Sequence, residues 1–109
     1  MRRGDIVTVA APGDYGKPRP AVVIQGDPLN QAEPRSTIVA LITSAVQDAP
    51  LLRLTVEPTP GNGLRVTSQV QVNRIVTAPV AKISSSIGQL TDQQLVEMNR
   101  LLAVVIGLG

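Results

Sequence analysis

Short apolar and β-branched runs alternate along this chain with proline-rich and glycine-rich breaks. The runs Ile6 to Val9, 21–25 and Thr37 to Thr43 each have the length and residue types of a strand. The third run is the most apolar, which predicts a strand in the centre of a sheet, buried on both faces. Between the second and third runs, two prolines, a glycine, an aspartate and an asparagine predict a long connection with a single helical turn.

The second half of the chain begins with two patterns of period two. Leu52, Leu54 and Val56 alternate with polar residues, which predicts a strand with one solvent-exposed face. The segment 67–77 alternates similarly and predicts another strand, with an irregularity near Asn73 and Arg74. A last short strand is expected in the segment 85–90.

The final residues have the pattern of an amphipathic helix. Thr91 with Gln94 three positions later forms a capping-box pattern, and Asp92 puts a negative charge at the helix start. Gly107 is a typical stop. One apolar stripe, which is expected to pack on the sheet, contains Leu95, Met98, Leu101, Leu102 and Val105.

These elements predict a mainly β fold: a small, curved antiparallel sheet, partly closed into a barrel, with a C-terminal helix. At 109 residues the chain is expected to form a single domain, 1–109. The absence of cysteine suits a reducing compartment. The longest apolar run, "LLAVVIGLG", is too short to span a membrane. We therefore expect a soluble, cytoplasmic protein.

The missing residue types exclude much chemistry. Without histidine or cysteine the chain lacks the usual nucleophilic triads and zinc sites, and its eight carboxylates are scattered without a DxD pair. No P-loop or GxGxxG motif is present, so we expect neither a metal nor a nucleotide cofactor. A net charge of +2 does not by itself indicate nucleic-acid binding, although Arg65, Arg74 and Lys82 fall in a segment free of acidic residues. That segment is either a locally positive face or an ordinary solvated edge.

The stretch "GKPRPAVVIQGD" contains the first candidate for chemistry. Arg19 stands between Pro18 and Pro20, and both Lys17 and Arg19 precede a proline, which restricts them to extended backbone angles. A guanidinium held at such a point suits a phosphate, because its planar fork matches two phosphate oxygens. The alternative is a surface arginine at the start of an edge strand that the prolines protect.

The second candidate is the hydroxyl pair Thr43 and Ser44, which follows the most apolar predicted strand. The end of a strand is a place where a rigid scaffold often presents functional groups. The alternative is that both residues simply end the strand and begin a turn.

Further motifs accompany these two in a fixed order: "RGDIV", "GKPRPAVVIQGD", "TIVALITS", "GL" before "SQVQVNRI", and a terminal helix after "IGQLT" that ends in "IGL". In this order, across nearly the whole chain, they resemble the MazF/PemK toxin family. The resemblance implies a homodimeric, SH3-like barrel that cleaves single-stranded RNA or mRNA sequence-specifically without a metal. It also implies a cognate antitoxin whose tail lies over the RNA groove.

By this resemblance the catalytic pair is Arg19 and Thr43. The reaction it implies is attack of a ribose 2'-hydroxyl on its own phosphate, which leaves a cyclic phosphate and a free 5'-hydroxyl. Arg19 would stabilise the negative charge of the transition state. Thr43 would donate a hydrogen bond or relay a proton near the 2'-hydroxyl or the leaving oxygen. Candidate RNA-binding residues are Tyr15, Lys17 and Ser44 as neighbours, with Gln69 and Asn73 reading base edges. Asn73 stands where the family frequently has an acidic residue.

Two alternatives of another class remain open at this point. A gyrase poison of the CcdB type would share the fold and act by binding a protein, but such toxins rely on a tryptophan near the C-terminus, and this chain has no tryptophan. A catalytically silent barrel that only dimerises and binds an antitoxin would use Arg19 as scaffold. In each case the apolar C-terminus predicts self-association as a two-fold dimer.

Overall fold

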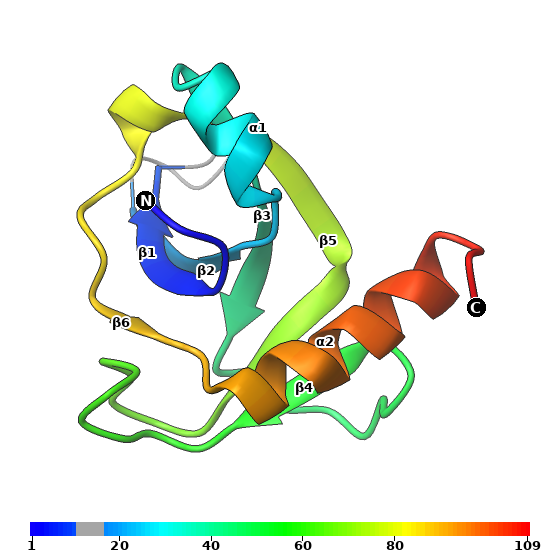
Figure 1. Ribbon diagram of the computed structural model, residues 1–109. Helices are drawn as coiled ribbons and strands as arrows, with labels where there is room; N and C mark the ends of the chain where they lie inside the picture. Colours follow the sequence, from blue (N-terminus) through cyan, green and yellow to red (C-terminus); the bar gives the residue numbers. More distant parts are fainter. Residues whose placement is uncertain (11–16) are drawn as a thin grey trace.

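The structure, a computed structural model, describes residues 1–10 and 17–109. Its central feature is a six-stranded antiparallel sheet, strongly curved into a half-barrel, with strand order β4-β5-β3-β2-β1-β6 (Figure 1). The strands are β1 (Asp5–Val9), β2 (Arg19–Val23), β3 (Ser36–Thr43), β4 (Arg53–Val56), β5 (Ser68–Pro79) and β6 (Gly88–Gln89). A helix α1 (Asp27–Ala32), a 3-10 turn η1 (Val80–Lys82) and a C-terminal helix α2 (Asp92–Val105) complete it. The predicted fold class is confirmed.

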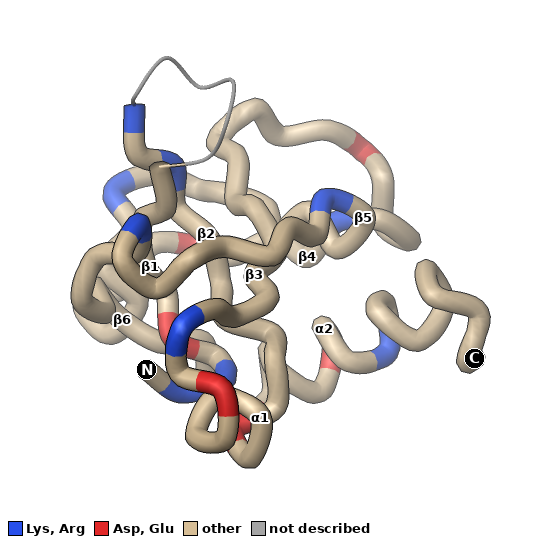
Figure 2. The backbone as a smooth tube through the Cα atoms, turned by 90° about the horizontal axis from the view of Figure 1, so that it is seen from above, with Lys and Arg blue, Asp and Glu red and all other residues tan. Residues whose placement is uncertain are grey.

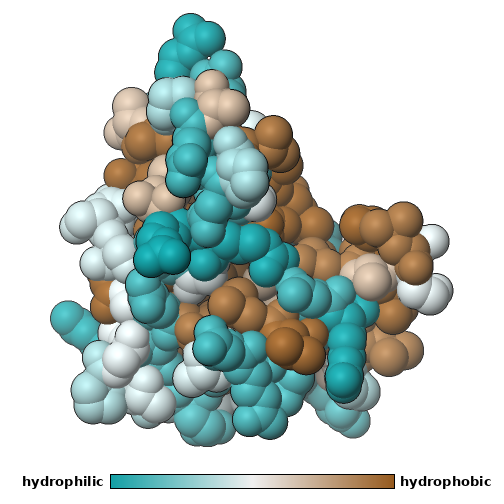
Figure 3. Space-filling view, viewed as in Figure 1, coloured by the Kyte–Doolittle hydropathy of each residue, from teal (hydrophilic) through white to brown (hydrophobic). Residues whose placement is uncertain are grey.

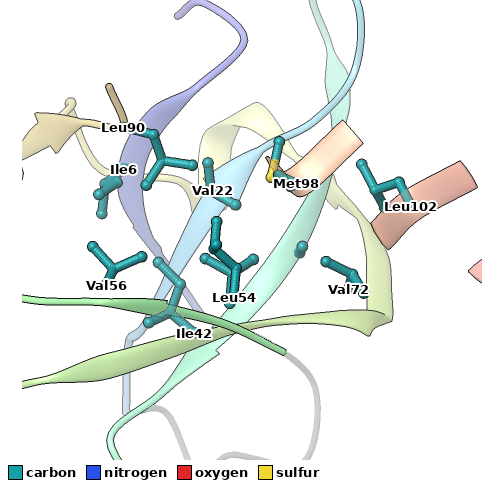
Figure 4. Close-up of a cluster of buried hydrophobic side chains, with 11 residues drawn as sticks. Ile6, Val22, Ile42, Leu54, Val56, Val72, Leu90, Met98 and Leu102 are labelled. Atoms are coloured by element: carbon teal, nitrogen blue, oxygen red, sulfur yellow. The ribbon is translucent and has the colours of Figure 1, made fainter. Parts of the chain in front are cut away.

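The apolar side chains of β3 point alternately into two separate cores. Ala40 and Ile42 belong to the larger core, which α2 covers, whereas Val39 and Leu41 belong to a smaller one on the opposite face. Figure 4 shows side chains of the larger core converging from the sheet and from α2. The prediction of a central strand buried on both faces is confirmed, because β3 lies between β2 and β5.

The irregularity predicted in the long strand is present in β5. Its pairing with β3 runs in register as far as Ala40 opposite Ile75, and resumes with Ile42 opposite Val70. The extra residues between these pairs, which include Asn73 and Arg74, form a bulge that bends the strand. The N-terminal half of β5 can therefore pair with β4 as well as with β3.

Helix α2 begins and ends where the sequence predicts. Thr91 accepts a hydrogen bond from the Gln94 backbone amide, and the Gln94 side chain accepts one from the Thr91 amide, which completes the capping box. Gly107 adopts a positive φ of 82° just after the helix. Met98 and Leu102 are buried against the sheet, and the other members of the predicted stripe pack around them.

The N-terminal "RGDIV" segment has a structural role. Asp5 is 5% exposed and accepts hydrogen bonds from the Arg2 amide and from the Gln89 side chain, which ties β1 to β6. Arg3 donates through its side chain to the Ile24 carbonyl and to Asn99 on α2. These bonds hold the start of the chain against the sheet and the helix.

Some strand boundaries differ from the prediction. The second strand, expected over 21–25, is Arg19–Val23. Leu52, which the alternating pattern assigned to the fourth strand, precedes β4 and is exposed. Its amide bonds the Ala49 carbonyl in a turn, and its carbonyl accepts from Val72 on β5, so local turn geometry overrides the alternation here. Among the residues that the structure describes, no helix has both the length and the apolar character needed to cross a membrane.

Candidate active site

An open groove of about 400 Å³ lies where β2 begins and β3 ends. Arg19 and Pro20 line it from β2, and Thr43 and Ser44 line it from the end of β3. We call this feature the Arg19 groove. Its remaining lining consists of Thr8, Ile42, Gly63, Leu64, Arg65, Val66, Ser68 and Ile87. The two candidates chosen from the sequence therefore face one space, although they come from different strands.

Arg19 is the first residue of β2 and pairs with Val9, the last residue of β1. The next residue, Pro20, pairs with Thr8 within the ladder. This placement agrees with the expectation that the two prolines put the arginine at a junction between loop and strand. The arginine is half-buried, so its guanidinium lies at the groove wall with part of its surface still accessible.

Thr43 ends β3, and its hydroxyl is held by the backbone that follows. Its Oγ1 accepts a hydrogen bond of 3.1 Å from the amide of Ala45. In the described part of the chain no acceptor is bonded to the hydroxyl hydrogen, which is therefore available to a ligand in the groove. Ser44, the neighbouring residue, is exposed.

The third wall of the groove is the segment 63–66, at the end of a loop between β4 and β5. Asn62, which is 2% exposed, organises this loop from inside: its Oδ1 accepts from the amides of Thr59 and Leu64, and its Nδ2 donates to the Glu57 carbonyl. Arg65 follows and is exposed at the groove. The loop thus brings a second cation to the groove that Arg19 lines.

The charged residues in the described lining of the groove are basic. Two arginines line it, and no aspartate or glutamate is among the lining residues that the structure describes. Figure 2 shows several basic positions near the start of β2, and acidic positions spread over the tube, some of them at α1. Within the described residues no group of three His, Cys, Asp or Glu side chains is placed to hold a metal ion. The groove offers guanidinium groups and hydroxyls, a set that suits a phosphodiester.

Residues 2–106 match the family described as PemK-like, MazF-like toxin of type II toxin-antitoxin system. The chain belongs to this family. It is 42% identical over 110 residues to the probable endoribonuclease MazF of Mycolicibacterium smegmatis, a match that covers 100% of this chain and 99% of the relative.

Solved structures share the fold of this family member. An endoribonuclease from a mycobacterial species, in complex with its cognate antitoxin, superposes with a TM-score of 0.81 at 19% identity over 100% of this chain and 97% of that one. The toxin MazF-mt6 of Mycobacterium tuberculosis gives a TM-score of 0.81 at 22% identity, covering 96% and 98% of the two chains. A MazE–MazF complex of Deinococcus radiodurans gives 0.79 at 17% identity, covering 100% and 97%.

The other predicted RNA-binding residues are placed differently from one another. Lys17 is exposed just before β2, and Tyr15 lies outside the described residues. Asn73 is exposed in the β5 bulge and does not line the Arg19 groove. The family resemblance therefore suggested a wider RNA surface than the groove itself covers.

Gln69 is the residue whose surroundings differ most from the prediction. It is 3% exposed, and its amide makes four internal hydrogen bonds. Oε1 accepts from the Gln47 amide and from Arg53, and Nε2 donates to the Gln47 carbonyl and to Thr55. This bonding uses the full capacity of the amide, so the structure does not favour a Gln69 that reads a base edge.

Two contributors to the groove were not singled out from the sequence as site residues. Arg65 was noted only as one of three cations in a segment without acidic residues, and Asn62 was not considered. The "NG" pair at Asn62 and Gly63 is a turn signal, but it does not say which wall the turn will form.

Proposed function

We propose that the Arg19 groove is the active site of an endoribonuclease toxin that cleaves single-stranded RNA without a metal. Membership of the MazF-like toxin family supplies the activity class. The observation that carries the proposal is the convergence of Arg19 and Thr43 on one positively charged groove. Residues that are distant in sequence and able to bind a phosphodiester share this space, and the described part of its wall contains no carboxylate to repel it.

The reaction that suits these residues is an internal transesterification. The 2'-oxygen of a ribose forms a bond to the adjacent phosphorus, and the bond from phosphorus to the 5'-oxygen of the next nucleotide breaks. One proton passes, in net terms, from the 2'-hydroxyl to the departing 5'-oxygen. The products are a 2',3'-cyclic phosphate and a free 5'-hydroxyl, and no water or redox partner is consumed.

Arg19 stabilises the extra negative charge that develops on the phosphorane. A guanidinium acts by charge and by hydrogen bonding rather than as a base. Thr43 complements it. Its Oγ1 already accepts from Ala45, so the hydroxyl donates its hydrogen to a phosphoryl or leaving oxygen.

The RNA chain on either side of the scissile phosphate contacts the surroundings of the groove. Lys17 and Ser44, both exposed, bind its backbone, and Tyr15 belongs to the same proposed surface by its place in the sequence. Arg65, which lines the same groove, adds a second phosphate contact. Asn73 contacts RNA farther along β5, where its exposed amide offers both a donor and an acceptor.

The partners follow from the family and the surface. The relatives from mycobacteria and Deinococcus are described as complexes with an antitoxin, and we propose that this chain binds one too. We also propose a homodimer through the apolar surface at the end of α2, which Figure 3 shows on the right. A groove of about 380 Å³ lies there, lined by Ile24, Ile38, Ile75, Leu102, Ile106 and Leu108 among others.

The proposed substrate also implies a location. Because mRNA is translated in the cytoplasm, we propose that the toxin acts there.

The proposal is tested by incubating the purified protein in EDTA with a long single-stranded RNA and mapping the ends. We expect discrete cuts with 5'-hydroxyl ends. The variants Arg19→Ala and Thr43→Val should fold but lose cleavage by about 100-fold or more. Arg35→Ala, which removes an exposed arginine paired with Glu33 away from the groove, is the matched control and should cleave normally.

Two results would overturn the assignment. Equal cleavage by Arg19→Ala and the unaltered protein, prepared identically, would point to a contaminating nuclease or to another site. Intact RNA from folded protein would leave a binding function, and inhibition of DNA supercoiling by gyrase would then be the next assay.

A further inference from the structure

The loop between β3 and β4 is held against the sheet by two side chains. Gln69 on β5 bonds both the amide and the carbonyl of Gln47, each at 3.0 Å. Arg53, the first residue of β4, donates through Nη1 to the carbonyl of Ala45 at 2.7 Å and to Gln69 Oε1 at 3.0 Å. The loop begins directly after Thr43, so its position sets the surroundings of that hydroxyl.

Ala45 is bonded at both ends of its backbone. Its amide donates to Thr43 Oγ1 at 3.1 Å, and its carbonyl accepts from Arg53. The apolar side chain of Ala45 is itself exposed, so burial does not hold this residue in place. Of these two hydrogen bonds to the Ala45 backbone, the one from Arg53 is the shorter. Ala45 alone connects Arg53 to the Thr43 hydroxyl.

We propose that Arg53 is a positioning residue, which orients the Thr43 hydroxyl for cleavage by holding the Ala45 backbone. This inference rests on the proposed role of Thr43 in the Arg19 groove. The chain of contacts runs from the guanidinium to the Ala45 carbonyl, and then from the Ala45 amide to Oγ1. Without the first bond the amide is free to turn away. Thr43 Oγ1 then accepts from water, and the hydroxyl loses the backbone donor that orients it.

The guanidinium suits this role better than an ammonium would. Arg53 contacts three acceptors from one planar group: the Ala45 carbonyl, Gln69 Oε1 and, through Nη2, Gln71 Oε1 at 3.4 Å. Gln71 Nε2 is buried with no partner among the described residues. Turning that amide over would put its NH2 group against the guanidinium, so Arg53 also determines how Gln71 lies. A lysine could reach one of these acceptors but not all three.

Arg53 is not itself among the residues that line the Arg19 groove. It lines a separate cleft between β4 and α2, together with Arg100 and Glu97. The geometry therefore does not place Arg53 in contact with the scissile phosphate. An effect of Arg53 on the reaction has to pass through the loop, which distinguishes a positioning residue from a catalytic one.

The first test separates kcat from KM in RNA cleavage. Arg53→Met keeps most of the apolar stem and removes every donor, and we expect kcat to fall between about 10-fold and about 100-fold with KM nearly unchanged. Arg53→Lys should recover part of kcat, because an ammonium can still donate to the Ala45 carbonyl. Arg100→Met is the matched control: it removes an exposed arginine from the same cleft, and its kinetics should not change.

A double-mutant cycle asks whether Arg53 acts through Thr43. In the Thr43→Val background the hydroxyl is gone, so Arg53→Met should lower the residual rate no further. A second, multiplicative loss in this background would overturn the proposal, because it would show that Arg53 acts independently of the hydroxyl. An unchanged kcat in Arg53→Met would overturn it as well.

The second test needs no RNA. Solvent exchange of the Ala45 amide, measured by NMR, should be at least about 10-fold faster in Arg53→Met and unchanged in Arg100→Met. Unchanged exchange in Arg53→Met would refute the positioning role even if the protein cleaves RNA. If the unaltered protein cleaves no RNA but the exchange responds as expected, the proposed function fails and the contact chain stands. If Arg53→Met does not fold, Arg53→Lys, which keeps only a single-point donor for Ala45, should give a smaller change of the same sign in both tests, and no change in either would refute the proposal.

Discussion

Thr43 on β3 and Gln69 on β5 are opposite partners in the antiparallel register, yet their side chains meet different surroundings. Thr43 lines the open groove, whereas Gln69 is enclosed by the loop that follows Thr43 and by β4. The Thr43–Gln69 pair thus connects the Arg19 groove to the loop between β3 and β4, which Gln69 holds in place. The predictions below concern the groove, its support and the surface used for assembly.

Substitution of Gln69 by leucine should destabilise the protein and not change which sites are cut. The change leaves the Gln47 backbone groups, Thr55 and Arg53 without their internal partner, and we expect the free energy of unfolding to fall by about 2 kcal/mol. Urea denaturation measures this, with Gln93→Leu on the exposed face of α2 as the control. Normal stability together with a shifted cleavage sequence would instead restore Gln69 as a reader of bases.

Substitution of Gly88 by alanine should displace the loop that carries Arg65. A Cβ at Gly88 would lie 2.2 Å from the backbone carbon of Asn62, and backbone cannot yield as a flexible side chain can. We expect a loss of about 3 kcal/mol in unfolding free energy, together with slower cleavage.

The control for the Gly88 substitution is Gly61, which lies in the loop between β4 and β5 that carries Arg65. A Cβ at Gly61 meets only the Thr59 side chain, at 3.8 Å, so Gly61→Ala should be tolerated. Thermal unfolding and RNA cleavage are measured on both variants. Equal behaviour of the two would show that the close packing between Gly88 and Asn62 does not hold the groove wall.

Removal of the Arg65 side chain should weaken RNA binding and spare the chemical step. Arg65 lines the same groove as Arg19, from the loop between β4 and β5, and we assign it to a neighbouring phosphate. In Arg65→Ala, KM should rise at constant kcat, and the slope of log affinity against log salt should become shallower by about 0.7. A fall in kcat as large as that of Arg19→Ala would place Arg65 at the scissile phosphate itself.

An aspartate at Ile106 should convert the proposed dimer into a monomer. Ile106 is 57% exposed and Leu108 is 79% exposed, and both line the apolar groove at the end of α2. Burying an unpaired carboxylate in an interface there is costly. Light scattering on Ile106→Asp checks this, with Leu29→Asp on the exposed α1 as the control. A monomeric unaltered protein would refute the proposed interface.

Much of this architecture was predictable because the signals are local. The apolar run of β3, the Thr91 capping box and the stripe of α2 depend on residues close together in sequence, and each element formed where predicted. The prolines beside Arg19 restrict the backbone at that residue, so its place at the start of β2 could be read directly. Thr43 was predictable for the same reason, as the residue at the end of the most apolar strand.

The misplaced expectation for Gln69 has a physical reason of another kind. Alternation along β5 indicates which residues share a face but not what later covers that face. Here the loop between β3 and β4 folds over it, and Arg53 and Gln69 bond the loop backbone. Such contacts join segments that are distant in sequence, and no pattern within either segment reports them.

The sequence by itself determined the strands and the capped helix, because turn residues, hydrophobic periodicity and the geometry of proline act within a few positions. It proposed Arg19 and Thr43 for the chemistry through the resemblance to the MazF/PemK family. Only the tertiary structure decided that Arg19 and Thr43 share a groove with Arg65, that Gln69 is internal, and that Arg53 bonds the backbone beside Thr43. The curvature of the sheet and the packing of its loops set these relationships, since both arise from contacts that exist only once the whole chain is folded.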